Sequence, residues 1–209
     1  MILGDLFEVW VGDDAMQGEF ESRCAQVLQA CAERCSVAFM AGNRDFLVGE
    51  RMLGDCGVRG LEDPSVLVAQ GTRLLLTHGD ALCVGDEEYQ QFRRLVRGAS
   101  WQREFLALEL PLRRERAQQI RTQSKERQRL QSSGEWFDVD AATAVQWLQA
   151  AGATTMIHGH THRPGSGLLA PGYMRHVLSD WELDHGNPPR AEVLRLQGAK
   201  LTRLPAPLP

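Results

Sequence analysis

The sequence predicts an α/β fold, and three observations support this class. Short apolar runs alternate along the chain with segments whose apolar residues recur at helical spacing. Several of the apolar runs end in a glycine-containing turn that carries a polar side chain. The length of 209 residues, with 43% hydrophobic and 24% charged residues, suits one α/β domain with or without an inserted cap. We therefore expect a single domain over residues 1–209.

The first part of the chain alternates predicted strands and helices. The run MIL leads directly into Gly4-Asp5 and predicts a strand. A helix is expected over about 19–34, then a strand at SVAFMAGN and a short helix near 46–55. The segment SVLVAQGTRLLLTHGD predicts two strands joined by a turn at Gly71.

The second part begins with an arginine-rich region, about 87–131, that is predicted to be helical with a break at Pro111. DVDAATAVQWLQAAG predicts an amphipathic helix that Asp138 or Asp140 caps and Gly152 ends. ATTMIHGH predicts another strand, and RHVLSDWEL and RAEVLRLQG are expected to complete the sheet. The final PAPLP is expected to be a loose tail.

The formal net charge of −4 conceals an uneven distribution, because Arg93 to Arg129 contains eleven basic and four acidic residues. Such a block usually forms a solvated helix face, but it also attracts anions. A nucleic-acid partner is not expected, since the rest of the chain is acidic and no recognition motif is visible. No apolar run is long enough to span a bilayer and no signal peptide is visible, so a cytoplasmic location is expected.

Four turns at the ends of predicted strands carry side chains that can bind metals. In open α/β sheets, ligands gather at the carboxyl ends of the strands, so turns that are distant in sequence can converge. An Asp, an Asn and several His offer nitrogen and oxygen ligands, which suits manganese, iron or zinc better than magnesium or calcium. Two such ions could clamp both oxygens of a phosphoryl transfer. The turns are Gly4-Asp5, Gly42-Asn43, His78-Gly79-Asp80 and His158-Gly159-His160-Thr161-His162.

Each of these turns also has a structural interpretation when taken alone. Asp5 could cap a turn, Asn43 could stabilise one, and His78 could be a hydrogen-bonded structural histidine. His160 and His162 are more telling, because residues two apart can point the same way from an extended turn, and a core strand rarely buries two neighbouring histidines. For His158, which lies inside the predicted strand, the structural interpretation is favoured.

The segments GDLFEVWVGDD, GNRDF, LTHGD and IHGHTHRP resemble the calcineurin-like metallophosphoesterases, and most closely their UDP-2,3-diacylglucosamine diphosphatase family. The resemblance implies a four-layer αββα sandwich with a helical cap inserted at about 87–131. It also implies two Mn²⁺ ions per full-length subunit. The expected reaction is hydrolysis of UDP-2,3-diacylglucosamine at the α phosphorus, which gives UMP and 2,3-diacylglucosamine 1-phosphate for lipid A biosynthesis.

The resemblance also implies roles for individual residues. Asp5 would bridge both metals, Asn43, His78 and His160 would hold the second ion, and His162 would complete the first. Of these, Asp5, Asn43, His78 and His160 are expected to be catalytic. The family pattern has an asparagine and a lysine where this chain has Gln128 and Gln131. The loss of the lysine would weaken the binding of the anionic part of the substrate, although Arg127 and Arg129 could substitute. The expected substrate-binding residues are Asn43, Arg44, Asp86, Ser124, Gln128, Gln131 and His160.

Two interpretations of the arginine-rich region remain open. Its apolar residues could form the core of the cap, or some of them could line a groove for acyl chains. The arginines would then meet anionic headgroups, which places the protein peripherally on the cytoplasmic face of the bacterial inner membrane. No obligate protein partner is expected. The apolar residues concerned are Tyr89, Phe92, Leu95, Val96, Trp101, Phe105, Leu106 and Leu110.

The superfamily's first motif, Asp-x-His on a strand before Gly4-Asp5, has no counterpart in the sequence. Without it, Asp5 and His162 alone would hold the first ion, and two ligands are few for a tight site. We therefore expect the natural protein to be longer, with Met1 an internal methionine or a misplaced start, and the activity of the chain as given to be doubtful. The alternatives are another dinuclear phosphoesterase or nucleotide hydrolase, and a non-catalytic lipid- or nucleotide-binding remnant.

Overall fold

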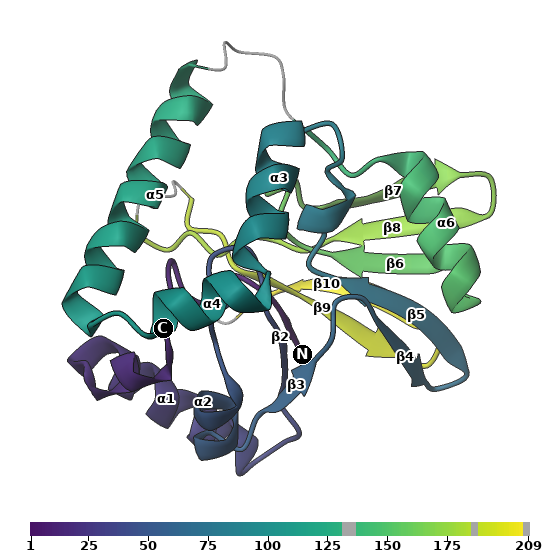
Figure 1. Cartoon of the computed structure of the whole chain (residues 1–209). Helices are drawn as coiled ribbons and strands as arrows, with labels where there is room; N and C mark the ends of the chain where they lie inside the picture. Colours follow the sequence, from purple (N-terminus) through teal and green to yellow (C-terminus); the bar gives the residue numbers. More distant parts are fainter. Residues whose placement is uncertain (131–136, 185–187, 207–209) are drawn as a thin grey trace. The chain divides into compact units, whose positions relative to one another are not determined.

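The computed structural model describes residues 1–130, 137–184 and 188–206, without the side chains of residues 125 and 127–130. It confirms the predicted α/β class, with strands and helices alternating along the chain (Figure 1). The chain divides into two compact units, each built from two segments. The first unit comprises Met1–Leu61 and Val84–Phe137, and the second comprises Glu62–Cys83 and Asp138–Pro209.

The first unit is built on a parallel sheet with the strand order β1-β2-β3. The strands are β1 (Ile2–Leu3), β2 (Ala38–Met40) and β3 (Arg59–Leu61), and all three residues of β2 are buried. The connections contain a 3₁₀ helix, η1 (Asp13–Gln17), and the helices α1 (Glu19–Ala32) and α2 (Glu50–Asp55). Strand β3 was not predicted, because Arg-Gly-Leu is too short to show an alternating pattern.

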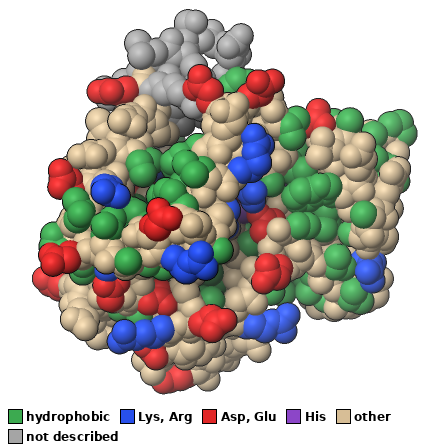
Figure 2. Space-filling view, in the orientation of Figure 1, with side chains coloured by type: hydrophobic (Ala, Val, Ile, Leu, Met, Phe, Trp, Pro, Cys, Tyr) green, Lys and Arg blue, Asp and Glu red, His purple; other side chains and the backbone are tan. Residues whose placement is uncertain are grey.

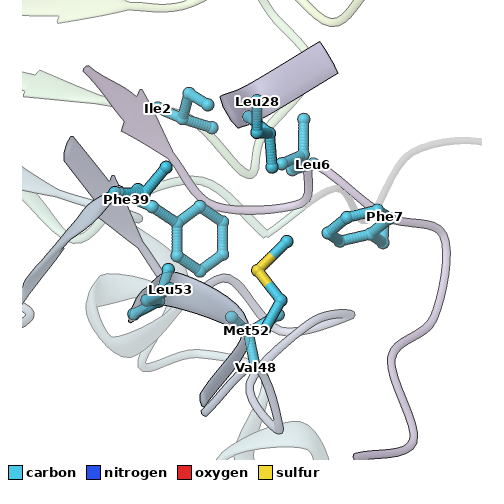
Figure 3. A pocket seen from close by; sticks show the side chains of 9 residues that line it. Ile2, Leu6, Phe7, Leu28, Phe39, Val48, Met52 and Leu53 are labelled. Atoms are coloured by element: carbon cyan, nitrogen blue, oxygen red, sulfur yellow. The ribbon is translucent and has the colours of Figure 1, made fainter. Parts of the chain in front are cut away.

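Apolar side chains from β1, β2, α1 and α2 pack into the core of this unit. Figure 3 shows Phe39 and Met52 facing each other, with Leu28 of α1 and Phe7 of the loop after β1 beside them. Phe7, Phe39 and Met52 are buried, and only hydrophobic side chains line the small pocket among them. This pocket is therefore part of the core, and it offers no ligand for a metal.

Three helices, α3 (Glu87–Val96), α4 (Ala99–Leu106) and α5 (Leu110–Leu130), occupy the region that was predicted to be helical. The expected break lies just before Pro111, which stands in the first turn of α5, where a proline costs no backbone hydrogen bond. Val96 and Phe105 are buried, and Phe105 belongs to the core cluster of the first unit.

Two arginines, one at the C-terminal cap of α3 and one within α5, anchor these helices within the first unit. The Arg113 side chain is buried, and its Nη1 donates to the Val11 carbonyl at 2.6 Å and to Asp14 Oδ1 at 2.8 Å. Arg97 Nη2 donates to the Gly42 carbonyl at 2.9 Å. Part of the basic block is therefore structural.

The second unit contains a five-stranded sheet with the order β4-β5-β6-β8-β7. Its members β5, β6 and β8 are parallel, and β4 and β7 run antiparallel to their neighbours. A 3₁₀ helix, η2 (Asp80–Leu82), follows β5. The strands are β4 (Ser65–Ala69), β5 (Thr72–Thr77), β6 (Thr155–His158), β7 (Gly165–Ala170) and β8 (Tyr173–Val177).

Helix α6 (Ala141–Ala151) packs against β7 and has the predicted caps (Figure 1). Asp140 accepts from the Thr143 N–H at its start, and Gly152 ends it with φ of 61°. Asp138, the other candidate cap, instead accepts two hydrogen bonds from Arg175, at 2.8 and 2.7 Å.

The end of the chain differs from the expectation. Strand β9 (Glu192–Gln197) pairs with β10 (Lys200–Pro205) in a separate two-stranded antiparallel sheet, so RAEVLRLQG does not complete the larger sheet. Pro205 lies in β10 and not in a tail, while residues 207–209 are outside the described part. None of the helices in the described part of the chain has the length and hydropathy of a transmembrane span.

Candidate metal and phosphate site

In the first unit, two neighbouring parallel strands carry the predicted ligand turns. Leu3 of β1 lies opposite Met40 of β2, so the Asp5 and Asn43 turns leave the same edge of the sheet. The Arg44 backbone N–H donates to Asp5 Oδ1 at 3.0 Å, and Arg44 Nε lies 3.4 Å from Asp5 Oδ2. The structure thus brings together a predicted metal ligand and the predicted phosphate contact, Arg44.

A buried carboxylate that the sequence analysis did not select, Asp45, holds these two turns in place. It accepts backbone N–H bonds from Gly42 and Leu6, both at 2.7 Å, from Asp5 at 3.2 Å and from Phe7 at 3.3 Å. Burial and, next, the nearby Asp5 charge raise the pKa of Asp45. Its place in GNRDF, directly after a predicted phosphate contact, was the signal available in the sequence.

The Arg44 guanidinium has a second acidic neighbour, Glu8. Arg44 Nη1 donates to Glu8 Oε1 at 2.7 Å. The other oxygen of Glu8 pairs with Arg121 of α5. One carboxylate therefore bridges two arginines that are distant in the sequence.

In the second unit, the register of β5 and β6 positions the histidine turns. Thr77 lies opposite His158, and the Gly159 N–H donates to the His78 carbonyl at 2.9 Å. The rings of His78 and His160 then meet edge to face, with centroids 5.2 Å apart and planes at 68°. Two predicted ligands of one ion therefore lie side by side at the carboxyl ends of adjacent strands.

His162, the third predicted histidine ligand, is exposed and lies beside Asp180, which follows β8. His162 Nδ1 is 3.4 Å from Asp180 Oδ2, and the same oxygen accepts from Arg190 Nη2 at 2.6 Å. Metal-ligating histidines commonly use one ring nitrogen for the metal and the other for a carboxylate. Asp180 is thus a candidate orienting group, which the sequence analysis did not identify.

His158 has the environment of a structural histidine, as favoured from the sequence. It is fully buried within β6, and its Nδ1 lies 3.0 Å from the Gly159 carbonyl oxygen. Burial, which disfavours the charged ring, lowers the pKa of His158 to about 4. The imidazole is therefore neutral at physiological pH.

Unusual backbone conformations coincide with the predicted ligands. Apart from Gln70, the non-glycine residues with positive φ in the described part of the chain are Asp5, His160 and His162, at 55°, 62° and 52°. Such conformations are costly for ordinary residues and cluster at functional sites. The backbone conformation therefore points to the same three candidate ligands as the chemical nature of their side chains does.

For the remaining predicted substrate-binding residues, the structure gives no evidence of contact with a substrate. Asp86 caps α3 by accepting from the Tyr89 N–H at 3.0 Å, and Ser124 is exposed on α5. The side chain of Gln128 and the whole of Gln131 lie outside the described residues. Their roles in substrate binding stay predictions, as does that of Asn43.

The helices of the first unit also enclose a surface groove with a volume of about 500 Å³. Hydrophobic side chains gather on this helical region among charged ones (Figure 2). Trp101 stacks on Phe105, with ring centroids 4.8 Å apart and planes at 11°. The groove is lined by Trp101, Glu104, Phe105, Leu108, Arg116, Gln119, Ile120 and Gln123.

Known proteins resemble this chain over most of its length. A protein from Ralstonia nicotianae, named UDP-2,3-diacylglucosamine hydrolase, is 44% identical over 214 residues, which cover 98% of this chain and 79% of that protein. Proteins with the same name from Chromobacterium violaceum and Bordetella parapertussis are 40% and 39% identical, covering 98% and 91% of this chain and 83% and 75% of their own lengths.

No protein-family model matches the chain. Among solved structures, a single mutant of Vps29 from Entamoeba histolytica is 11% identical, with a TM-score of 0.38 and coverage of 99% of this chain and 98% of that one. The relatives found by sequence share 39–44% of their residues with this chain, and they identify its family. This chain belongs to the UDP-2,3-diacylglucosamine hydrolase family.

Proposed function

We propose that the protein hydrolyses UDP-2,3-diacylglucosamine in lipid A biosynthesis. Water adds its oxygen to the α phosphorus, the bond from that phosphorus to the bridging oxygen breaks, and the products are UMP and 2,3-diacylglucosamine 1-phosphate. The observation that carries the proposal is 44% identity over 98% of the chain to a protein of this name. The arrangement of potential ligands within each unit supports a metal-dependent reaction.

We further propose that the protein binds a pair of Mn²⁺ ions. Asp5 and Asn43 of the first unit and His78, His160 and His162 of the second offer carboxylate, amide and imidazole donors, a mixed set that suits manganese. The adjacent His78 and His160 rings and the positive φ of Asp5, His160 and His162 fit this use. Bound metals of this kind lower the pKa of a water molecule and stabilise charge on phosphoryl oxygens.

Arg44 is the residue proposed to grip the diphosphate. Its guanidinium keeps its charge at all physiological pH values and presents a planar fork that matches phosphate oxygens. Asp5 contacts the Nε atom of Arg44, and Glu8 contacts its Nη1 atom. These two contacts do not involve Nη2. Arg44 would thus orient the diphosphate and stabilise the charge that develops as the bond breaks.

The groove on the helical region is proposed to receive acyl chains. Trp101, Leu108 and Ile120 give it an apolar lining, while Arg116 offers a positive charge at its wall. The side chains of Leu95 and Leu106 are 59% and 42% exposed, which supports peripheral docking on the anionic cytoplasmic face of the inner membrane. Co-sedimentation with phosphatidylglycerol vesicles, but not with phosphatidylcholine vesicles, is the expected result.

Hydrolysis in ¹⁸O-labelled water tests the reaction. The purified protein is incubated with UDP-2,3-diacylglucosamine and Mn²⁺, and both products are analysed by mass spectrometry. We expect UMP to carry the label and the sugar phosphate to carry none, because the α phosphorus accepts the water oxygen. Label in 2,3-diacylglucosamine 1-phosphate would contradict the proposed site of attack, and no turnover with Mn²⁺ by a protein that also carries the expected Asp-x-His strand would contradict the enzyme assignment.

A deacylated analogue separates this function from that of a general phosphoesterase. If the apolar groove binds acyl chains, UDP-glucosamine should be hydrolysed with a kcat/KM at least about 100-fold lower, since two long chains bury far more apolar surface than this requires. Equal rates for the two substrates would favour a nucleotide hydrolase. The substitution Trp101→Ala should reduce this discrimination, whereas Phe20→Ala, at an exposed aromatic residue of α1, should not.

A further inference from the structure

Glu8 joins two cationic side chains of the first unit into one cluster. Its Oε1 accepts from Arg44 Nη1 at 2.7 Å, and its Oε2 pairs with Arg121 of α5. The Glu8 side chain is 72% exposed, while those of Arg44 and Arg121 are only 22% and 27% exposed. The two arginines are therefore enclosed by their surroundings, and an exposed carboxylate connects them.

The two guanidinium groups both contact Glu8, and two positive charges placed so close together repel each other. Like charges repel, and an arginine on a helix surface can turn away into solvent. Glu8 offsets that repulsion, and Asp5, whose Oδ2 lies 3.4 Å from Arg44 Nε, brings the net charge of these four side chains to zero. The guanidinium N–H groups that the two carboxylates do not use can donate to a further anion.

We propose that Glu8 is a positioning residue, which holds the guanidinium groups of Arg44 and Arg121 so that both meet the diphosphate of the substrate. This inference rests on the proposed function. The inference adds a role for Glu8, which is not among the residues expected to bind the metal or the substrate. Arg121 then grips the same anionic group from α5 while Arg44 grips it from the turn after β2.

The anchoring of α5 supports a defined position for Arg121. Arg113, two turns earlier on the helix, is buried and is bound to the Val11 carbonyl and Asp14. The loop from Glu8 to Asp14 therefore contacts α5 at two points. With the helix fixed at Arg113, the contact with Glu8 decides where the Arg121 guanidinium lies.

A competing interpretation is that Glu8 occupies the anion site and must leave when the substrate binds. The two roles predict opposite effects of Glu8→Gln. A positioning role means weaker anion binding, because the amide NH₂ group repels one of the two guanidinium groups. A competing role means tighter binding, because a negative charge has been removed from the site.

Calorimetry with inorganic pyrophosphate, on metal-free protein in EDTA, distinguishes these roles. We expect Glu8→Gln to weaken binding by about fivefold to tenfold, the effect of losing one charge-assisted hydrogen bond that is partly exposed. Glu21→Gln is the matched control, since it neutralises the carboxylate of another ion pair to α5, Arg114–Glu21, and should change the affinity less than twofold. Unchanged or tighter binding by Glu8→Gln would overturn the proposal.

A double-mutant comparison tests whether Glu8 acts through Arg121. Arg121→Gln should weaken pyrophosphate binding, and adding Glu8→Gln should cause less further loss than it does in the wild type. Fully additive losses would contradict the positioning role. Thermal unfolding of each variant accompanies the titration, because a merely structural contact would lower Tm and leave the affinity of the folded protein unchanged.

Kinetics with UDP-2,3-diacylglucosamine separate this inference from the proposed function. In Glu8→Gln, KM should rise by about fivefold and kcat should stay within about twofold, because the residue acts on binding of the diphosphate. If the wild type hydrolyses the substrate and the variant keeps its KM, only the role of Glu8 is wrong. If the wild type shows no turnover even when it carries the expected Asp-x-His strand, the proposed function is wrong, and the pyrophosphate titration still decides the role of Glu8.

Discussion

The two units hold their predicted ligands by different means. In the first unit, β1 has only two residues, and the turns of Asp5 and Asn43 are tied together by the buried carboxylate of Asp45. In the second unit, His78 and His160 follow longer paired strands, and a backbone hydrogen bond from Gly159 to the His78 carbonyl links them. The geometry of the first unit therefore depends on one ionisable side chain, whereas that of the second depends mainly on the backbone.

This difference predicts that substitutions act differently in the two units. In the second unit, a histidine can be replaced while the strands keep the turn. In the first unit, removing Asp45 should disturb the turns without touching any ligand. The following predictions begin with the largest expected effect.

Replacing His160 by Asn removes an imidazole while retaining a residue that tolerates positive φ. We expect kcat on UDP-2,3-diacylglucosamine to fall at least about 100-fold, the scale of losing a group that acts directly on the reacting phosphate. The circular dichroism spectrum should not change. Gln70→Asn, at a positive φ of 51° outside the proposed site, is the control and should retain activity. Retained activity in His160→Asn would show that the reaction does not need the His160 imidazole.

Replacing Asp45 by Ala should destabilise the protein most. The substitution leaves backbone N–H groups of Gly42, Asp5, Leu6 and Phe7 without their acceptor, and buried unsatisfied donors cost about 1–3 kcal/mol each. We expect the free energy of unfolding, measured in urea, to fall by at least about 3 kcal/mol.

Asp63 of the second unit provides the comparison, because it accepts the His78 N–H at 3.3 Å and is hydrogen-bonded to the Thr77 side chain. Asp63→Ala should cost less than half as much as Asp45→Ala. Equal losses would show that the two units depend on side-chain carboxylates to the same extent.

Replacing Asp180 by Asn should weaken metal binding in the second unit through His162. An amide is a poorer acceptor than a carboxylate for the imidazole N–H, so the ring is less basic and less well oriented. We expect the apparent Mn²⁺ affinity to fall by about tenfold, measured by calorimetry. Asp184→Asn, which neutralises an exposed carboxylate nearby in the sequence, should have no effect. An unchanged affinity in Asp180→Asn would remove Asp180 from the site.

The smallest effect concerns the pH dependence of the Asp138–Arg175 pair. The hydrogen bonds from Arg175 hold the pKa of Asp138 below its usual value, so the pair stabilises the fold above that value and loses this contribution as pH falls through the lowered pKa. At pH 7, Asp138→Asn should cost about 1 kcal/mol, since the pair is partly exposed. The difference between the two proteins should shrink as pH falls below the usual carboxyl range, and a difference that stays constant with falling pH would exclude an ionic origin.

The parts of the fold that were predicted correctly are those with long local patterns. Strands β5 and β6 contain uninterrupted apolar residues, helix α6 has apolar residues at helical spacing, and Asp140 and Gly152 mark the ends of α6. Strands β3 and β7 escaped prediction, because Arg-Gly-Leu and the glycine-rich GSGLLA lack an alternating pattern. The partner of β9 was predicted wrongly, because pairing depends on contacts that the local sequence does not encode.

In the candidate site, too, some residues could be predicted from the sequence and others could not. The turns of Asp5, His78 and His160 could be predicted, since each couples glycine to a ligand at the end of an apolar run. The residues that support them could not, because their contacts are distant in the sequence. Glu8 is separated by 36 residues from Arg44 and by 113 from Arg121. Asp45 contacts Leu6 across 39 positions.

The burial of Arg113 has a consequence for anyone who wishes to swap or delete the helices between residues 87 and 131. Phe105, Arg113 and Ala117 are buried within the first unit, and the Arg113 side chain satisfies the Val11 carbonyl. A chimaera cut at residues 87 and 131 would therefore lose part of the unit's interior along with the helices. Chimaeras that exchange these helices should keep the stretch from Phe105 to Ala117 and vary only the surface beyond it.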